Sequence, residues 1–374
     1  MLLIREARPA DLEQLLELGR ILDSVNVPTE AEEIARLIDR SRRSFRGLLR
    51  NRGNAVYVFC AEDTSSGGLG GCSMIIAKHG TPQAPHYYME IATEERYSHT
   101  LRRMLRHTFL RLRYSMDGPT ELGGLVVAPS YRGHRAKVGK QLSWVRFLYI
   151  GKHPDRFQPH LIAEIMPPRT ASGSHLFWDH YGRRVTGLSF KEADRLSARD
   201  KEFIKALFPD APLYTFLLPE EVRASIGAVS DQSRPAVALL EQAGLRFLNQ
   251  IDPFDAGPYY GAPVRDLFAL KHLRFRKIES ATLACDTDEP RYLIAAEDHE
   301  HGFRAAAAVA DSNNGRILVH PKILDVLKVR RGDLVDVLAL PKISGAARRS
   351  AASADSQATH PRTAQRGEAQ VRSD

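Results

Sequence analysis

The sequence predicts a mixed α/β protein. Segments with apolar residues three and four apart, which is helical spacing, alternate with short runs of β-branched and aromatic residues, which favour strands. Alternation of this kind is typical of a sheet covered by helices. The chain becomes β-rich from about 292, and large apolar residues nearly vanish after 343. We therefore expect an α/β body at 1–274, a small β-rich module at 275–343 and a disordered tail at 344–374.

The elements of the body follow in order. In the first half we expect a strand at 2–5, helices at 12–22 and 30–49, and a hairpin of strands at 55–63 and 69–78. The polar stretch 79–98 shows no clear period, and the arginines between 102 and 113 have the spacing of a solvated helix face. In the second half we expect a strand at 121–128, a loop at 131–139, a helix at 140–151, a strand at 159–165, a helix at 174–182 closed by Gly182, helices at 201–207, 219–226 and 234–243, and a strand at 245–251.

Composition excludes several classes of protein. No run approaches eighteen apolar residues, so no membrane-spanning helix is expected, and the first residues lack a signal-peptide core. The three cysteines, Cys60, Cys72 and Cys285, are scattered. They exclude a disulfide framework and a CxxC metal knuckle, and they fit a reducing environment. We therefore expect a cytoplasmic protein without a bound metal.

The net charge of +8 is unevenly distributed. Residues 96–154 contain twelve Lys and Arg but only two acidic residues, whereas the remainder of the folded part is acidic. A local positive charge favours a compact polyanion such as a nucleotide cofactor. A nucleic-acid groove is disfavoured, because the stretch lacks regularly interleaved aromatic residues.

The basic segment contains a strand, a loop with two glycines and a helix. This arrangement directs backbone N–H groups and a helix N-terminus at an anion, and glycine allows a phosphate to approach the main chain. The candidate phosphate ligands are Arg132, Gly133, Arg135, Lys137, Gly139 and Lys140. The loop matches neither the P-loop nor the dinucleotide-binding pattern, so an ordinary strand-to-helix turn is the alternative.

This order of elements resembles the GNAT acyltransferase superfamily. In that superfamily the loop before the third main helix holds the pyrophosphate of acyl-CoA through a Q/R-x-x-G-x-G/A motif. Arg132 matches the first position and Gly139 the last, while Arg135 or Lys137 falls where the first glycine is expected. The segment RPAVALLEQAGLRF at 234–247 also resembles the later superfamily motif A-x-x-L-L-E-x-x-G-F.

The resemblance narrows to the arginine N-succinyltransferase family, from residue 1 to about 340 in colinear order. The most specific motifs are Phe177-Trp178 and Asp252-x-Phe254-Asp255-x-Gly257-Pro258. Weaker matches are Glu121-Leu122-x-x-Leu125, Tyr131-Arg132, Ser143-x-x-Arg146-Phe147, Ala163-Glu164, Gly182-Arg183, Pro212-x-Tyr214, Phe303-Arg304 and Gly332-Asp333-x-Val335. Two apolar helices that both end at glycine, Gly182 and Gly244, further predict a second GNAT-like half.

The resemblance implies transfer of a succinyl group from succinyl-CoA to the α-amino group of arginine, in arginine catabolism. The amine would attack the thioester directly in a ternary complex, with no acyl-enzyme and no metal. Related subunits also act on ornithine, and a homo- or hetero-oligomer is implied. A main-chain contact to succinyl-CoA falls at Leu125, and we expect Val127 on the same strand to contribute.

The family's proton donor is a histidine within I-G-x-V-H, whereas this chain has Ser230 at that position. A serine hydroxyl does not titrate near neutrality. Water or Asp231 takes part instead, or His175 or His180 substitutes, or the chemistry has changed. The alternative functions are therefore a weakened or inactive acyl-CoA-binding or regulatory subunit, and an acyltransferase for a different amine.

The acceptor amine is expected near Glu164, at the end of a strand, which is the candidate for deprotonating or anchoring it. Asp255, together with Asp252, is a candidate for binding a guanidinium, or for capping the turn before Pro258. The other predicted substrate-binding residues are Phe177 and Trp178.

Overall fold

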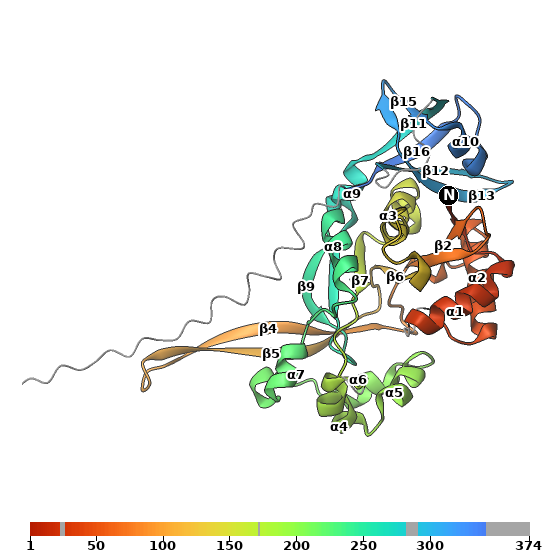
Figure 1. Ribbon diagram of the computed structural model, residues 1–374. Helices are drawn as coiled ribbons and strands as arrows, with labels where there is room; N and C mark the ends of the chain where they lie inside the picture. The colour runs from red at the N-terminus through yellow and green to blue at the C-terminus, as the bar shows by residue number, and fades with distance from the viewer. Residues whose placement is uncertain (23–26, 171–172, 282–290, 342–374) are drawn as a thin grey trace, which may run out of the picture. The chain divides into compact units, whose positions relative to one another are not determined.

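The computed structural model describes residues 1–22, 27–170, 173–281 and 291–341 (Figure 1). The described chain up to Leu340 forms one compact unit. The tail predicted to be disordered, 344–374, lies outside the described residues. No helix within the described ranges is long and apolar enough to cross a membrane.

The chain forms the predicted mixed α/β fold, with a large mixed sheet. The first half comprises β1 (Leu2–Glu6), α1 (Leu12–Leu22), α2 (Ala31–Phe45), β2 (Val56–Asp63), β3 (Leu69–Ile76), β4 (His86–Ser98), β5 (Arg103–Ser115), β6 (Thr120–Val127), α3 (Val138–Lys152) and β7 (His160–Glu164). The middle comprises α4 (Arg183–Thr186), α5 (Phe190–Ser197), α6 (Glu202–Leu207), β8 (Leu213–Tyr214), α7 (Glu220–Ser225), α8 (Arg234–Ala243), β9 (Arg246–Ile251), β10 (Pro258–Pro263) and α9 (Phe268–Lys271). The last part comprises β11 (Leu273–Ser280), β12 (Tyr292–Asp298), β13 (Gly302–Ala308), β14 (Asp311–Asn313), β15 (Arg316–Val319), α10 (Pro321–Leu327) and β16 (Leu334–Ala339).

The described strands join in the order β14-β15-β11-β16-β12-β13-β1-β2-β3-β6-β7-β10-β9-β4-β5-β8. Alternate residues of β2 face opposite sides of this sheet, as extended backbone requires. Tyr57 and Phe59 pack in the core that contains α3, whereas Val58 and Cys60 pack in the core that contains α1 and α2. Twelve of the fifteen residues of α3 are buried, which explains why its sequence is apolar on all sides.

The segment from 86 to 115 is a long β-hairpin, which corrects the helical interpretation of its arginines. Strands β4 and β5 pair in unbroken antiparallel register over their whole lengths. Arg106 reaches Glu95 at 2.7 Å and Arg113 reaches Glu90 at 3.1 Å across the two strands. Cross-strand ion pairs of this kind require extended backbone. The pairing partners lie in the stretch 79–98, whose strand character the sequence did not reveal.

The helix predicted to close at Gly182 continues beyond it. A π-helical turn runs into α4, which ends at Gly187 with a φ of 74°. Gly182 serves a different purpose, because a Cβ atom there would lie 2.2 Å from the ring of Trp178. The glycine therefore allows the indole to pack directly against the helix backbone.

The β-rich C-terminal segment extends the same sheet. Strand β13 pairs with β1 in antiparallel register, with Ile4 opposite Ala305. Strands β11 to β16 and α10 also bury a separate apolar cluster around Ile278, Ile294 and Val337. The segment thus has its own core and shares a sheet with the body, and a domain boundary near 275 remains a prediction.

Candidate active site

The sheet opens between the parallel strands β6 and β7. They pair only at the first two residues of β6, Thr120 and Glu121, within the described chain. At the same level β6 is bulged against β3, and Gly124 has a φ of 56°. This left-handed backbone and a Cβ position only 2.8 Å from the Met74 side chain of β3 both favour glycine there. The opening leaves one edge of the strand that carries Leu125 and Val127 available to an extended ligand.

The predicted phosphate loop connects β6 to α3. Helix α3 begins at Val138, so Gly139 lies in its first turn and not before it. Gly133 and Lys137 adopt left-handed conformations, with φ of 72° and 53°. Within the described part of the chain, the amides of Gly133, Arg135, Val138 and Gly139 have no hydrogen-bond partner. The loop therefore presents a set of N–H donors suited to an anion.

The cations of this loop differ in their accessibility. Arg132 and Arg135 are exposed, and Arg132 Nε also donates to the carbonyl oxygen of Val127 at 3.3 Å. Lys137 is half-buried, and Lys140 is buried, with 8% of its surface exposed. The two arginines are therefore the side chains best placed to bind a phosphate.

A buried guanidinium lies beneath the opening of the sheet. Arg146 of α3 is 2% exposed and donates to the carbonyl oxygen of Gly123 in β6 at 3.4 Å. It also bonds Ser143, through the hydroxyl at 3.2 Å and the carbonyl at 3.3 Å. Burial lowers the pKa of Arg146 to about 9. Arg146 thus carries positive charge next to the backbone of β6. The sequence places it in the same basic segment as the loop cations, and its buried position was not predicted.

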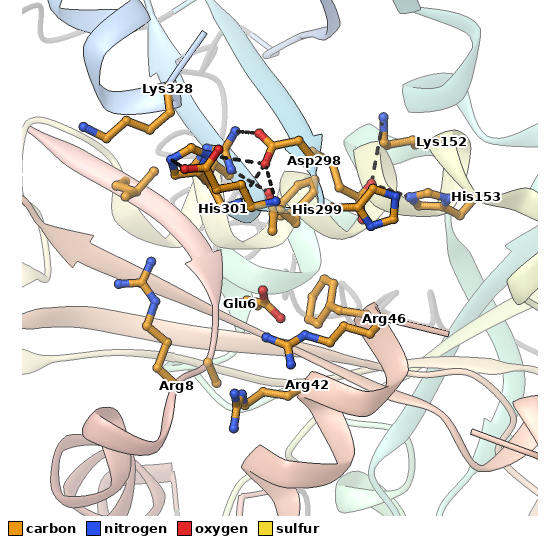
Figure 2. A pocket seen from close by; sticks show the side chains of 18 of the residues that line it. Glu6, Arg8, Arg42, Arg46, Lys152, His153, Asp298, His299, His301 and Lys328 are labelled. Atoms are coloured by element: carbon orange, nitrogen blue, oxygen red, sulfur yellow. Dashed lines mark hydrogen bonds and ion pairs between the residues drawn. The ribbon is translucent and has the colours of Figure 1, made fainter. Parts of the chain in front are cut away.

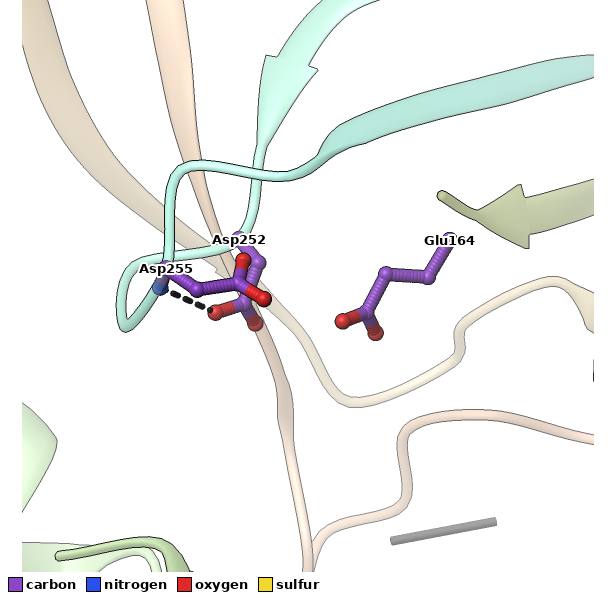
Figure 3. A group of neighbouring side chains, drawn as sticks. All are labelled: Glu164, Asp252 and Asp255. Atoms are coloured by element: carbon purple, nitrogen blue, oxygen red, sulfur yellow. Dashed lines mark hydrogen bonds between the residues drawn. The ribbon is translucent and has the colours of Figure 1, made fainter. Parts of the chain in front are cut away.

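Three carboxylates converge at the end of β7 (Figure 3). Glu164 is the last residue of β7, and Asp252 and Asp255 lie in the loop between β9 and β10. One carboxylate oxygen from each lies within 4.8 Å of the other two. The loop holds its aspartates through backbone bonds: the amides of Phe254 and Asp255 donate to Asp252 at 2.7 and 3.1 Å, and that of Gly257 donates to Asp255 at 2.7 Å.

Crowding of the three carboxyl groups makes it costly for all of them to be ionised at once. Loss of water around its carboxyl group raises the pKa of Glu164 well above its usual value, although part of the residue is exposed, and Asp252 and Asp255 raise this pKa further. Burial and the neighbouring Asp252 raise the pKa of Asp255 to about 8, and burial raises that of Asp252 as well. None of the three forms an ion pair with another described residue, although Lys201 lies near enough to lower the pKa of Glu164. Such a site suits a cation, whether an organic amine or a metal ion.

Several neighbours of the cluster were not predicted from the sequence. The hydroxyl of Tyr259 lies 3.4 Å from both Glu164 and Asp252. The ring of His86 is in edge contact with the ring of Tyr259, at 5.1 Å between centroids, and burial lowers the pKa of this histidine well below its usual value. His86 lies in the stretch 79–98, where no period was visible. Only its strand pairing would have placed it near the carboxylates.

Ser230 lies beside the chain that continues from β7. Its amide donates to the carbonyl oxygen of Met166 at 3.2 Å, and its hydroxyl donates to that of Ser233 at 2.8 Å. Asp231 is exposed and forms an ion pair with Arg234 at 2.9 Å. Ser230 therefore lies close in space to the residues that follow β7, while the neighbouring aspartate pairs with helix α8.

The two histidines considered as substitutes have structural contacts. His175 is buried, and its ring stacks on Phe190 at 3.7 Å between centroids. His180 Nδ1 lies 3.0 Å from the carbonyl oxygen of Leu176, one turn earlier in the same helix. These contacts support a role in packing for both.

Phe177 and Trp178 are fully buried. The indole of Trp178 stacks on Phe254 at 4.8 Å between centroids with nearly parallel planes, and its Nε1 donates to the carbonyl oxygen of Leu188 at 3.0 Å. Phe254 lies in the loop that carries the two aspartates of the cluster. Trp178 therefore supports this loop from the side of the core.

Comparison with known proteins agrees with this architecture. A family model described as arginine N-succinyltransferase beta subunit matches residues 2–269. The arginine N-succinyltransferases of Salmonella paratyphi B and Salmonella typhimurium are each 32% identical to this chain over 343 residues, which cover 91% of the chain and 98% of the relative.

A solved structure is also similar. The arginine/ornithine succinyltransferase subunit AI from Pseudomonas aeruginosa has a TM-score of 0.77 and 26% sequence identity, covering 91% of this chain and 99% of that one. The similarity extends over both the body and the β-rich C-terminal segment. The chain belongs to the arginine N-succinyltransferase family of acyltransferases.

Proposed function

We propose that this protein transfers a succinyl group from succinyl-CoA to the α-amino group of arginine, as a step of arginine catabolism. Membership of the family implies an acyl-CoA donor and an amino-acid acceptor. The observation that carries the choice of acceptor is the cluster of Glu164, Asp252 and Asp255, whose carboxyl groups lie together and form no ion pair with another described residue. Arginine at neutral pH carries both an ammonium and a guanidinium group, and it can neutralise such a cluster.

The donor would enter through the opening between β6 and β7. In this proposal the unpaired amides near Gly133 and the start of α3 bind the pyrophosphate, with Arg132 and Arg135 as charge-assisted donors. The pantetheine arm pairs with the free edge of β6 near Leu125 and Val127. The buried charge of Arg146 favours the oxyanion of the tetrahedral intermediate, or the distal carboxylate of the succinyl group.

The acceptor would bind with its cationic groups in the carboxylate cluster. Asp252 and Asp255 each keep one oxygen that does not receive a loop amide, so together they can accept a guanidinium. Glu164 has a raised pKa, which suits a base that takes a proton from the α-ammonium group. We propose that Phe177 and Trp178 act indirectly, by holding the aspartate loop through Phe254.

Proton transfer to the leaving thiolate is the step that the serine at 230 affects. Thioester aminolysis depends mainly on positioning and on donors to the oxyanion, and the CoA thiolate leaves without strong assistance. We propose that water at Ser230 supplies this proton and that catalysis is slower than with a histidine there.

The proposal is tested by the release of free CoA, monitored with a thiol reagent, and by mass spectrometry of the product. Succinyl-CoA is offered with arginine, ornithine, lysine and a neutral amino acid, with and without EDTA. We expect α-N-succinylarginine, unaffected by EDTA. Turnover with another amine alone would refute the choice of acceptor, and tight CoA binding without any turnover would favour a regulatory subunit. Loss of activity with EDTA would assign the carboxylates to a metal.

We also propose how the protein assembles and where it is located. The outer half of the β4–β5 hairpin has no further strand partner among the described residues, and it exposes Tyr97, Leu101 and Met104. We propose that it joins subunits of an oligomer. Cys60 and Cys72 are buried free thiols, which agrees with a cytoplasmic location.

A further inference from the structure

A cavity of about 1080 Å³ adjoins the last residues of α3, at the opposite end of this helix from the phosphate loop. Figure 2 shows the side chains that line it. It is lined by the end of β1, the end of α2, the last residues of α3 and the turn between β12 and β13. Helix α3 is fifteen residues long, so its two ends are about 22 Å apart. None of the predicted donor or acceptor residues lines this cavity, which makes it separate from the active site.

The acidic wall of the cavity is internally neutralised. Glu297 lies 2.7 Å from Nε2 of His153 and 3.9 Å from Nζ of Lys152. Asp298 forms an ion pair with Arg304 at 2.6 Å. These carboxylates already have partners, so this wall has little affinity left for a cationic ligand.

The opposite wall is rich in positive side chains, which, among the described residues of that wall, only Glu6 partly offsets. Arg8, Arg42, Arg46 and Lys328 line the cavity, and none of them forms an ion pair with any described residue. Figure 2 shows the three arginines around Glu6. Their positive charges lower the pKa of this carboxyl, although burial has the larger effect and raises it.

The side chain of Glu6 lies between the three arginines and the β12–β13 turn. Its Oε2 atom is buried and has no hydrogen-bond partner among the described residues. On the other side, Gly302 approaches so closely that a Cβ atom there would lie 2.1 Å from Oε1. The carboxylate thus lies close to the β12–β13 turn, and none of the three arginines around it forms an ion pair with it. Phe45 and Phe303, which are buried, supply an apolar floor.

We propose that this cavity binds a small organic polyanion with at least two carboxylate or phosphate groups. Arg8, Arg42 and Arg46 would bind the anionic groups, and the apolar part of the molecule would rest on Phe45. A single inorganic ion would fill little of the volume, which slightly exceeds the usual range for small-molecule pockets. Binding at this end of α3 makes the ligand an effector and not a substrate.

The test is calorimetric titration of the full chain with citrate and with pyrophosphate, at constant ionic strength and with saturating CoA to occupy the phosphate loop. We expect one site. Arg42→Ala combined with Arg46→Ala should weaken binding at least about tenfold, and Glu6→Gln should tighten it severalfold by removing a nearby negative charge. The control is Arg43→Ala on the same helix, which pairs with Asp39 and does not line the cavity.

Each outcome has a defined meaning. Binding of both probes indicates recognition of charge, and binding of citrate alone or pyrophosphate alone identifies a carboxylate or a phosphate ligand. The proposal is overturned if neither probe binds, if CoA abolishes the heat, or if the double variant binds like the wild type. It is also overturned if Glu6→Gln weakens binding, since the carboxylate would then be part of the attraction. Circular dichroism of each variant confirms that the fold is retained.

Discussion

The carboxylate cluster costs stability, and the substitution Asp255→Asn should reveal how much. The pKa of Asp255 is raised from 3.8 to about 8 by burial and by Asp252. The native state therefore keeps a proton that the unfolded chain loses between about pH 4 and pH 8, and the free energy of unfolding falls as pH rises through this window. Asparagine removes the charge, and its side-chain oxygen can still accept the bond from the amide of Gly257.

The size of the effect follows from the pKa. Each pKa unit is worth about 1.4 kcal/mol, so the rise from 3.8 to about 8 sets a ceiling of about 6 kcal/mol above pH 8. The three carboxylates share their protons and solvent reaches Glu164, which reduces this figure. We expect Asp255→Asn to raise the free energy of unfolding by about 1–3 kcal/mol at pH 7.5 and to have almost no effect near pH 4.

Urea unfolding followed by circular dichroism at pH 7.5 and pH 4 measures both values. Asp266→Asn, at an exposed aspartate, is the matched control and should change stability by less than about 0.5 kcal/mol. Asp255→Asn, unlike the control, should also bind arginine less tightly, with a higher KM. No stabilisation at pH 7.5, or an equal gain at both pH values, would refute the electrostatic account of the cluster.

Three further predictions concern the reaction. Glu164→Gln should lower kcat by about 10²–10⁴-fold, and an unchanged pH–rate profile would argue against Glu164 as the base. Combining Arg132→Ala with Arg135→Ala should raise the KM for acyl-CoA about 10–100-fold with little change in kcat, and an effect on kcat alone would place the phosphates elsewhere. Ser230→His should raise kcat by about tenfold or more if the chemistry of the family is retained, and no gain in stopped-flow turnover would contradict the proposed role of that position.

The parts of the fold that could be predicted are those with local sequence signals. The strand–loop–helix unit around Gly133 and the helix stopped by Gly244 both follow from short-range rules on glycine and apolar spacing. The hairpin at 86–115 was not predicted, because its arginines have helix-like spacing and the cross-strand pairs that hold them, such as Arg106 with Glu95, appear only once the two strands are aligned.

The same distinction applies to the candidate site. Glu164 and Asp255 were identified through their motifs, and the structure brings their carboxylates together. Tyr259 and His86 join them only through the pairing of β10 with β7 and through ring packing, which no local pattern encodes. The unpaired edge of β6 likewise depends on Gly124, whose role is visible only when β3 is beside it.

The central claim is that the cluster of Glu164, Asp252 and Asp255 selects a cationic acceptor for acyl transfer. The most direct measurement compares kcat/KM for arginine with that for citrulline, which has nearly the same shape but an uncharged side chain, using succinyl-CoA as donor. The account predicts that arginine is preferred by about 10²-fold or more, because the carboxylates lose their counter-charge with citrulline. Equal rates with the two acceptors, or a preference for citrulline, would contradict it.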